Sequence, residues 1–311
     1  MKALVRFWRK YSDRLMIYGL LLLFMAVSVL LDEDFLSARN LRNIFTSNMP
    51  FLMGAYAQTI VILAGGVDLS IGAGISLVTC ICATCSLTPS VGGLMFAFLL
   101  AFAAMLLKGS LNGLLITKCG IQPLICTLAV SLITAGCALA VLGKPGGSVA
   151  KEFAKPFTTP LSLVIIFFMV TVVLCLLLYK TRLGKAIYAT GGNSACAYSA
   201  GISVDGTILK AYLLSGALAA LGGIILSCQM RSGDPIAGDP LTLKTLTASV
   251  MGGASFSGGK GRIECTFAGV MIFAIINNIL NLIGISSFYQ YVAQGVLLIV
   301  AITLTSDKRR Q

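Results

Sequence analysis

One aspartate within an apolar region is the first residue of this sequence that could carry chemistry. Asp68 lies in the stretch LAGGVDLSIGAG, residues 63–74, between two long apolar segments. As a helix cap, its carboxylate would accept hydrogen bonds from the amides of Ser70 or Ile71. In a broken membrane helix beside a transport pathway, it would instead hydrogen-bond a polar solute, since ionisable residues inside membranes are usually functional. The two interpretations are compatible.

Side-chain amides form a second group of polar residues in or beside apolar segments. Asn277 and Asn281 are four residues apart, so they share one face of a helix. Amides at membrane depth need partners on other helices or in a wet cavity. They could join helices, or they could line a pathway for a neutral polar solute. On the second interpretation, the candidate pathway residues are Asp68, Gln58, Asn112, Asn277 and Asn281.

The spacing of reactive residues does not support an enzyme. The chain has no histidine, which removes the commonest general base and metal-binding imidazole. Cys80, Cys82 and Cys85 lie in an apolar run without a second cluster at zinc-site spacing. The stretch SGGKGR, residues 257–262, lacks the spacing of a nucleotide-binding P-loop. We therefore expect no catalytic residue, no metal site, no cofactor and no ATP binding by this chain.

The composition places most of the chain in lipid. Charged residues make up 11%, against about 25% in soluble domains. Apolar runs near the roughly 20 residues needed to cross a bilayer recur along the chain, and lipid forces them to be helical. We expect an all-α polytopic membrane protein with about ten transmembrane helices in a single domain, residues 1–311. The predicted spans are roughly residues 15–31, 44–64, 70–87, 92–110, 121–142, 160–179, 209–229, 243–256, 264–284 and 287–304.

Lysine and arginine predict the orientation. Basic residues cluster in 1–14, in 180–185 and in 308–310, so the positive-inside rule makes both termini and the 180–208 loop cytoplasmic. Three lysines in the outer loop 143–156 are the exception. The net charge of +12 is thereby explained by topology, and we expect contact with membrane lipid and no nucleic acid. In this scheme Asp234 and Asp239 belong to an outer loop.

The order of the spans suggests an internal repeat and a docking loop. Spans two to five and seven to ten form two blocks that enter the membrane from opposite sides, as an inverted repeat would. In the 180–208 loop, Asn193 is a candidate N-cap and Gly201 a candidate C-cap of a short helix. A capped helix in a loop between spans suggests a docking surface.

Several ordered stretches resemble the membrane subunit of ribose-type sugar importers of the ATP-binding-cassette class, a family that also serves xylose, galactose and autoinducer-2 systems. The resemblance runs from about residue 35 to the C-terminus. The stretches are LAGGVDLSIGAGISL (63–77), NGLLITKCGIQPLICTLA (112–129), TRLGKAIYATGGNSACAYSAGISV (181–204), MGGASFSGGKGRIECTFAGVMI (251–272) and NNILNLIGISSFYQYVAQGVLLIVA (277–301).

The resemblance implies a dimeric permease in a bacterial inner membrane, with a solute-binding protein outside and ATPase subunits inside. It also makes 180–208 the coupling loop, in which Gly191, Gly192, Asn193 and Gly201 match the family pattern. Ser194 and Cys196 depart from that pattern and leave the loop helix nearly uncharged. That departure leaves open which ATPase the loop fits and whether the second permease subunit is identical or different.

Two functions follow from these observations. The first is an importer permease for a monosaccharide or similar small polar solute, with ATP hydrolysis on a separate subunit. The alternative is an ion-coupled secondary transporter, with Asp68 as the proton or sodium site. Such carriers tend to use chains of ionisable residues within the membrane, whereas Asp68 is nearly alone in this sequence. The residues do not select among pentoses, hexoses and other small polar solutes.

Overall fold

The structure is a computed structural model that describes residues 2–85 and 91–286, with residues 289, 292, 295, 296 and 299 beyond them; for 2–14, 91 and 94 it describes the backbone alone. Over these residues the regular structure is helical apart from one isolated bridge between Gly146 and Gly233. The helices are α1 (Lys2–Leu31), the 3-10 helix η1 (Glu33–Leu36), α2 (Ala38–Ser47), α3 (Met49–Leu63), α4 (Ile71–Cys85), α5 (Val91–Lys118), α6 (Pro123–Val141), α7 (Lys151–Thr158), α8 (Pro160–Lys180), α9 (Arg182–Gly192), α10 (Ser194–Ser199), α11 (Val204–Met230), α12 (Asp239–Met251) and α13 (Ile263–Leu282).

The predicted all-α architecture is confirmed in the described part of the chain. Five of its helices, α5, α6, α8, α11 and α13, are long and apolar enough to cross a membrane, by length and composition. Three shorter apolar segments, Leu15–Leu31 of α1, α3 and α4, add to them. The tenth predicted span, 287–304, lies outside the continuous described residues, so the count of ten and the inverted repeat stay predictions.

Two helices extend well beyond their predicted spans, because α1 begins at Lys2 and α5 continues to Lys118, and two further spans differ in division or position. The second, 44–64, is divided at Asn48 between α2 and α3, where Pro50 occupies the first turn of α3. Proline has no N–H to donate to the last turn of α2, so the helical hydrogen-bond ladder is interrupted here. The eighth, 243–256, is α12, which begins earlier and ends at Met251, before two glycines.

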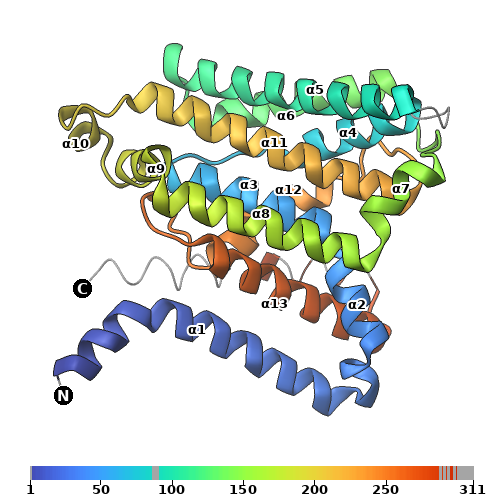
Figure 1. The fold of residues 1–311 in the computed structure, drawn as a ribbon, viewed down its shortest axis with the longest axis horizontal. Coiled ribbons are helices and arrows are strands. Elements are labelled where there is room, and N and C mark those ends of the chain that lie inside the picture. The colour runs from blue at the N-terminus through green and yellow to red at the C-terminus, as the bar shows by residue number, and fades with distance from the viewer. Residues whose placement is uncertain are drawn as a thin grey trace.

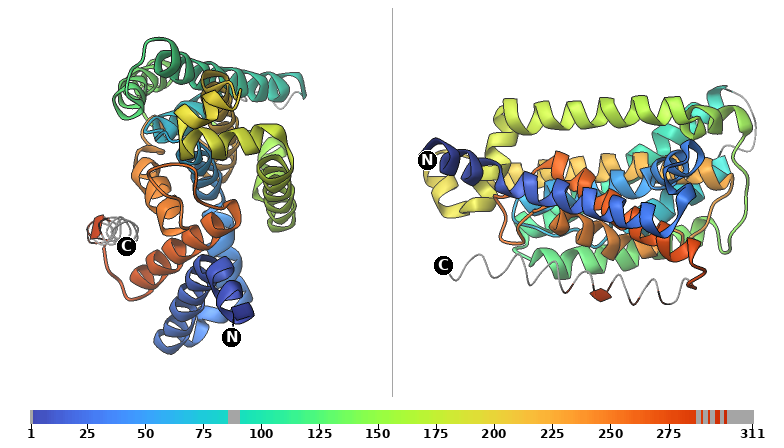
Figure 2. Two further views of the ribbon diagram at one scale, coloured as in Figure 1. Left: turned by 90° about the vertical axis from the view of Figure 1, so that its left-hand side faces the viewer. Right: turned by 90° about the horizontal axis from the view of Figure 1, so that it is seen from below.

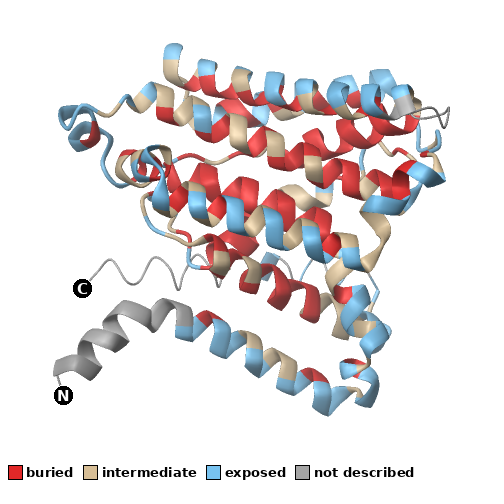
Figure 3. Ribbon diagram, viewed as in Figure 1, coloured by how far each residue is buried: buried red, intermediate tan, exposed pale blue. Residues whose placement is uncertain are grey.

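The core of the bundle is formed by α3, α4 and α11. Every residue of α3 is buried, and so is most of α4 (Figure 3). The helices around them expose large apolar side chains, such as Leu107 of α5 and Leu132 of α6, which are 72% and 71% exposed. In water these surfaces would be unfavourable, so lipid is the environment that fits them. On one face of the bundle, α8 packs against α2, α3 and α13 (Figure 2). There Phe167 contacts Phe45 and Phe267, and Thr171 bonds to Tyr56.

The two ends of the bundle carry different elements. The first turns of α1 lie at the same end as α9 and α10, whereas α2 and α7 lie at the opposite end (Figure 1). The predicted topology requires the N-terminus and the 180–208 loop to share a side, and this arrangement agrees with it. That this side is the cytoplasmic one stays a prediction.

Candidate functional site

A non-helical segment, residues 64–70, returns into the bundle between α3 and α4. Asp68 and Ser70 are fully buried in it. Its backbone finds partners on other helices: the Leu69 amide donates to Thr127 Oγ1 at 3.1 Å, and the Tyr212 hydroxyl donates to the Val67 carbonyl at 3.0 Å. Irregular backbone at membrane depth requires such partners. The predicted break in the helix is therefore present, and α6 and α11 cover it.

Asp68 holds this segment together through four hydrogen bonds from three residues. Its Oδ1 accepts from the Ser70 amide at 2.9 Å, which is the predicted hydrogen bond just before α4, and from Ser70 Oγ at 2.5 Å. Its Oδ2 accepts from Lys108 Nζ at 3.2 Å and from Ser215 Oγ at 2.8 Å. The side chain of Lys108 is 3% exposed and that of Asp68 is fully buried, so the ion pair is closed to solvent.

Lys108 was not among the candidate residues, although the sequence carries a signal for it. It is the one ionisable residue within the predicted span 92–110. An isolated lysine at membrane depth needs a carboxylate partner, and Asp68 was available. Because α5 continues to Lys118, Asn112 lies one turn beyond Lys108 in the same helix. Its Nδ2 donates to Ser70 Oγ at 2.9 Å, so Asn112 belongs to the Asp68 cluster.

The other candidate amides lie elsewhere. Gln58 is fully buried in α3, and neither atom of its amide has a hydrogen-bond partner. Asn277 Oδ1, in α13, is likewise buried without a partner, whereas Asn281 is exposed near the end of that helix. Asn278 exchanges two hydrogen bonds with Asn40 of α2, at 3.3 and 3.0 Å, and so joins two helices.

The 180–208 loop contains two helices rather than the one predicted. The expected short helix is α10: Asn193 Oδ1 accepts from the Cys196 amide at 2.9 Å, and Gly201, with φ of 77°, follows its C-terminal end. Both predicted caps are therefore present. The preceding helix, α9, was not anticipated, because α8 ends at Lys180 and α9 begins only two residues later.

Glycine backbones join α9 to two other loops. A Cβ on Gly191 would collide with the Leu63 carbonyl oxygen at the end of α3 and with the Gly259 amide. A Cβ on Gly258 would likewise collide with the Gly191 carbonyl and with Gly65 Cα. The Gly259 amide also donates to the Leu63 carbonyl at 3.0 Å. We call this contact of residues 63–65, 191 and 258–259 the glycine contact. It lets three segments of the chain meet where any side chain would separate them.

Tyrosines reinforce the same end of the bundle. The Tyr188 hydroxyl of α9 donates to the Gly261 carbonyl at 2.9 Å, and the Tyr179 hydroxyl of α8 donates to Glu264 Oε2 at 2.6 Å. Burial raises the pKa of Tyr188, so its hydroxyl keeps the proton that it donates. The loop after α12 is thus held against α9 by the glycine contact and by the hydrogen bond from Tyr188 to Gly261.

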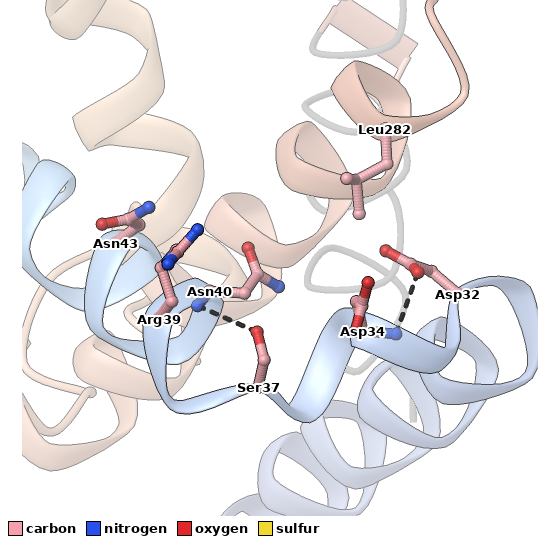
Figure 4. A pocket seen from close by; sticks show the side chains of 7 residues that line it. All are labelled: Asp32, Asp34, Ser37, Arg39, Asn40, Asn43 and Leu282. Carbon is pink, nitrogen blue, oxygen red and sulfur yellow. Dashed lines mark hydrogen bonds between the residues drawn. The ribbon is translucent and has the colours of Figure 1, made fainter.

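A polar pocket of about 480 Å³ lies at the opposite end of the bundle, where α1, η1 and α2 meet α13 (Figure 4). Within it, Asp32 Oδ1 accepts from the Asp34 amide at 3.0 Å, and Ser37 Oγ accepts from the Asn40 amide at 3.2 Å. These local bonds shape the turn between α1 and α2. The lining residues are Asp32, Asp34, Ser37, Arg39, Asn40, Asn43 and Leu282.

Apolar helices around a buried, broken segment, with a capped helical loop at one end, define a multi-pass membrane protein of the permease kind. Residues 40–302 match the family described as "Branched-chain amino acid transport system / permease component", and the chain belongs to this family. Membership confirms the resemblance to transport permeases, which are membrane subunits and not enzymes themselves.

Curated relatives of this chain are named as sugar permeases. It is 36% identical over 301 residues to the ribose import permease protein of Bacillus subtilis, covering 93% of this chain and 91% of that protein. It is 31% identical over 307 residues to the D-allose transport system permease protein of Escherichia coli, covering 96% and 92%. It is 31% identical over 314 residues to the galactose/methyl galactoside import permease protein of Escherichia coli, covering 94% of both chains. No solved structure matches the chain.

Proposed function

We propose that this chain is the transmembrane permease subunit of an ATP-binding-cassette importer in a bacterial inner membrane. It moves a monosaccharide or similar small polar solute that a solute-binding protein delivers from outside. ATPase subunits dock on the cytoplasmic side, and a second permease subunit, identical or different, completes the pathway. The names of the relatives support a sugar as the solute.

The observation that carries this proposal is the attachment of α9 and α10 to the helices of the bundle. Tyr198 of α10 is 76% exposed, a large side chain outside the apolar helices that is available to a partner. Tyrosine is common among the residues that dominate protein interfaces. The glycine contact then joins α9 directly to the end of α3 and to the loop that follows α12. A displacement of the docked loop would therefore reach both helices through backbone contacts.

The roles within the loop follow from these contacts. Gly191 transmits displacement through the glycine contact, and Gly192 and Asn193 connect α9 to the capped α10. Gly201 ends α10 in a conformation that most residues avoid. The ATPase thereby acts on one rigid unit.

Asp68 and Asn112 hold the segment between α3 and α4, and we assign them to the solute pathway together with Gln58, Asn277 and Asn281. The ion-coupled alternative would need Asp68 free to bind a proton or sodium ion. Its carboxylate instead pairs with Lys108, which favours the importer.

Purification from the native membrane tests the proposal. The tagged chain, extracted in mild detergent, should bring an ATPase subunit with it, identified by mass spectrometry. Proteoliposomes of the complex should import sugar only with ATP inside and the binding protein outside. Gly201→Trp should abolish this uptake while the protein still inserts, whereas Gly201→Asn should retain it, because asparagine tolerates the left-handed conformation. Transport by the chain alone under an ion gradient would overturn the proposal.

A further inference from the structure

A second irregular segment enters the bundle from the pocket-bearing end. Residues 233–238 run along α4 and are bonded to it at successive turns. A Cβ on Gly233 would meet Ala83, Thr79 Oγ1 donates to the Asp234 carbonyl at 3.0 Å, and the Gly238 amide donates to Ser76 Oγ at 2.8 Å. The segment therefore descends antiparallel to α4.

The descent ends near the middle of the membrane. Gly238 packs against Gly72, in the first turn of α4, at a backbone distance that leaves no room for a Cβ on either residue. From Ala83 to Gly72, α4 rises about 17 Å, roughly half of the apolar thickness of a bilayer. Asp239, predicted in an outer loop, instead begins α12 at this depth.

From this depth α12 runs only 13 residues, about 20 Å, too short to cross a bilayer. It packs parallel to α3, with Thr245 beside Gly54 and Val250 beside Ile62. Both helices end at the glycine contact or just beside it. The helix therefore lies between the deep end of the 233–238 segment and the loop that contacts α9.

The first half of α12 presents charge on its open face. Asp239 is exposed, Lys244 is half-buried, and Leu243 between them is 58% exposed. Asp239 lies one turn before Leu243, and Pro240 one turn before Lys244, so the two pairs form adjacent stripes along the helix. A carboxylate and an ammonium group at mid-membrane depth do not face lipid; such residues line water-filled paths or contact protein. Irregular backbone at this depth has the same requirement.

We propose that the 233–238 segment and the first half of α12 line the solute pathway, with Asp239 and Lys244 as its hydrogen-bonding groups. The carboxylate accepts from, and the ammonium group donates to, the hydroxyls of an uncharged polyhydroxylated solute. This inference rests on the proposed import function. Residues 233–238 would then be a second re-entrant segment beside the pathway, in addition to the segment around Asp68.

Cysteine accessibility tests the pathway in the complete importer, in membrane vesicles of both orientations. The exposed native cysteines, Cys119, Cys137 and Cys196, are first replaced by serine. Leu243→Cys is then compared with Leu132→Cys, which lies on the apolar face of α6 and is 71% exposed. A charged, membrane-impermeant methanethiosulfonate requires a hydrated thiolate, so we expect it to label position 243 at least about tenfold faster than position 132.

Equal labelling at the two positions from both sides of the membrane would overturn the proposal. Ile236→Cys, on the 233–238 segment and 58% exposed, serves as a second probe if Leu243→Cys does not insert. ATP-dependent sugar uptake is measured in the same vesicles. Fast labelling of position 243 with uptake that does not depend on ATP would reject the import function and support the pathway lining. Slow labelling with ATP-driven uptake would support the import function and reject the pathway lining.

The polar contacts are tested separately in the same vesicles. Asp239→Leu and Lys244→Leu should each lower uptake of the imported sugar about tenfold, because each removes one hydrogen-bonding group from the path. Protein yield and labelling of Leu243→Cys should stay unchanged in both variants. Full uptake in both would show that the two charges do not contact the solute.

Discussion

Lys108 Nζ lies 3.2 Å from Asp68 Oδ2, and both side chains are closed to solvent in the middle of the bundle. The pair joins α5 to the irregular segment before α4. Buried ion pairs contribute little net stability compared with apolar replacements, but removing one partner leaves an uncompensated charge. The pair therefore fixes the position of the segment more than it stabilises the fold.

Replacement of Lys108 alone should damage the protein more than replacement of both partners. Lys108→Met leaves the Asp68 carboxylate buried without a counter-charge, which costs about 3–5 kcal/mol. The double variant Asp68→Asn, Lys108→Met removes the stranded charge and should recover part of the loss. Thermal unfolding in detergent, followed by size-exclusion chromatography, measures both effects.

A matched control lies in the same helix. Lys118 Nζ is 3.8 Å from Asp205 Oδ2, and the two side chains are 70% and 56% exposed. Exposed pairs of this kind contribute about 0–1 kcal/mol, so Lys118→Met should leave the unfolding temperature nearly unchanged. Equal losses for Lys108→Met and Lys118→Met would show that burial does not decide the cost.

Local chemistry around Asp68 was predictable from the sequence, whereas its partners were not. The hydrogen bond from the Ser70 amide to Asp68 joins residues two positions apart, and the nearby glycines indicate that the helix is interrupted. Lys108 is 40 positions away. A predicted helix end at residue 110 does not say which face meets Asp68. Only the packing of α5, α11 and the irregular segment brings Lys108 and Ser215 to one carboxylate.

Gly191→Ala tests the glycine contact. The added methyl group would collide with the Leu63 carbonyl, so α9 must separate from the end of α3, at a cost of about 1–3 kcal/mol. We expect lower thermal stability and lower ATP-driven uptake in proteoliposomes. Gly192→Ala is the matched control, because its Cβ meets nothing within 4 Å and should leave both quantities unchanged. A harmless Gly191→Ala would contradict the close approach.

Tyr198→Ala tests the docking surface on α10. The side chain is 76% exposed, so its loss should leave the unfolding temperature unchanged. If the side chain anchors the ATPase, truncation should weaken co-purification of that subunit about tenfold or more. Ser199→Ala, the exposed neighbour, should retain the ATPase. Undiminished association of the ATPase with Tyr198→Ala would place the docking contact on another part of the loop.

The capped helix α10 was predictable from the sequence because its ends depend on local residues. Asn193 and Gly201 specify the ends of α10 within a few residues, which is a local property. The descent of residues 233–238 is not local. Thr79 and Ser76 of α4 supply the hydrogen bonds that allow irregular backbone at this depth, and neither residue is near that segment in sequence. Asp239 was consequently expected in an outer loop, although it begins α12 inside the bundle.

Replacement of Gln58 should change stability and transport in opposite directions. Its amide is fully buried and both polar atoms lack partners, which costs about 1–3 kcal/mol in this conformation. Gln58→Leu should therefore raise the unfolding temperature. If the amide serves the solute pathway, the same variant should lower ATP-driven uptake.

The hydroxyl of the adjacent residue, Thr59, provides a control that should change the unfolding temperature in the opposite direction. Thr59 Oγ1 lies 3.0 Å from Ser249 Oγ and 2.8 Å from Thr266 Oγ1, so its polar group is fully used between α3, α12 and α13. Thr59→Val should lower the unfolding temperature, because it strands hydroxyls that Gln58→Leu leaves untouched. A more stable Gln58→Leu with normal uptake would make Gln58 a purely structural residue. A more stable Gln58→Leu variant with impaired uptake would instead show that transport needs the Gln58 amide, although this amide has no partner in the present conformation.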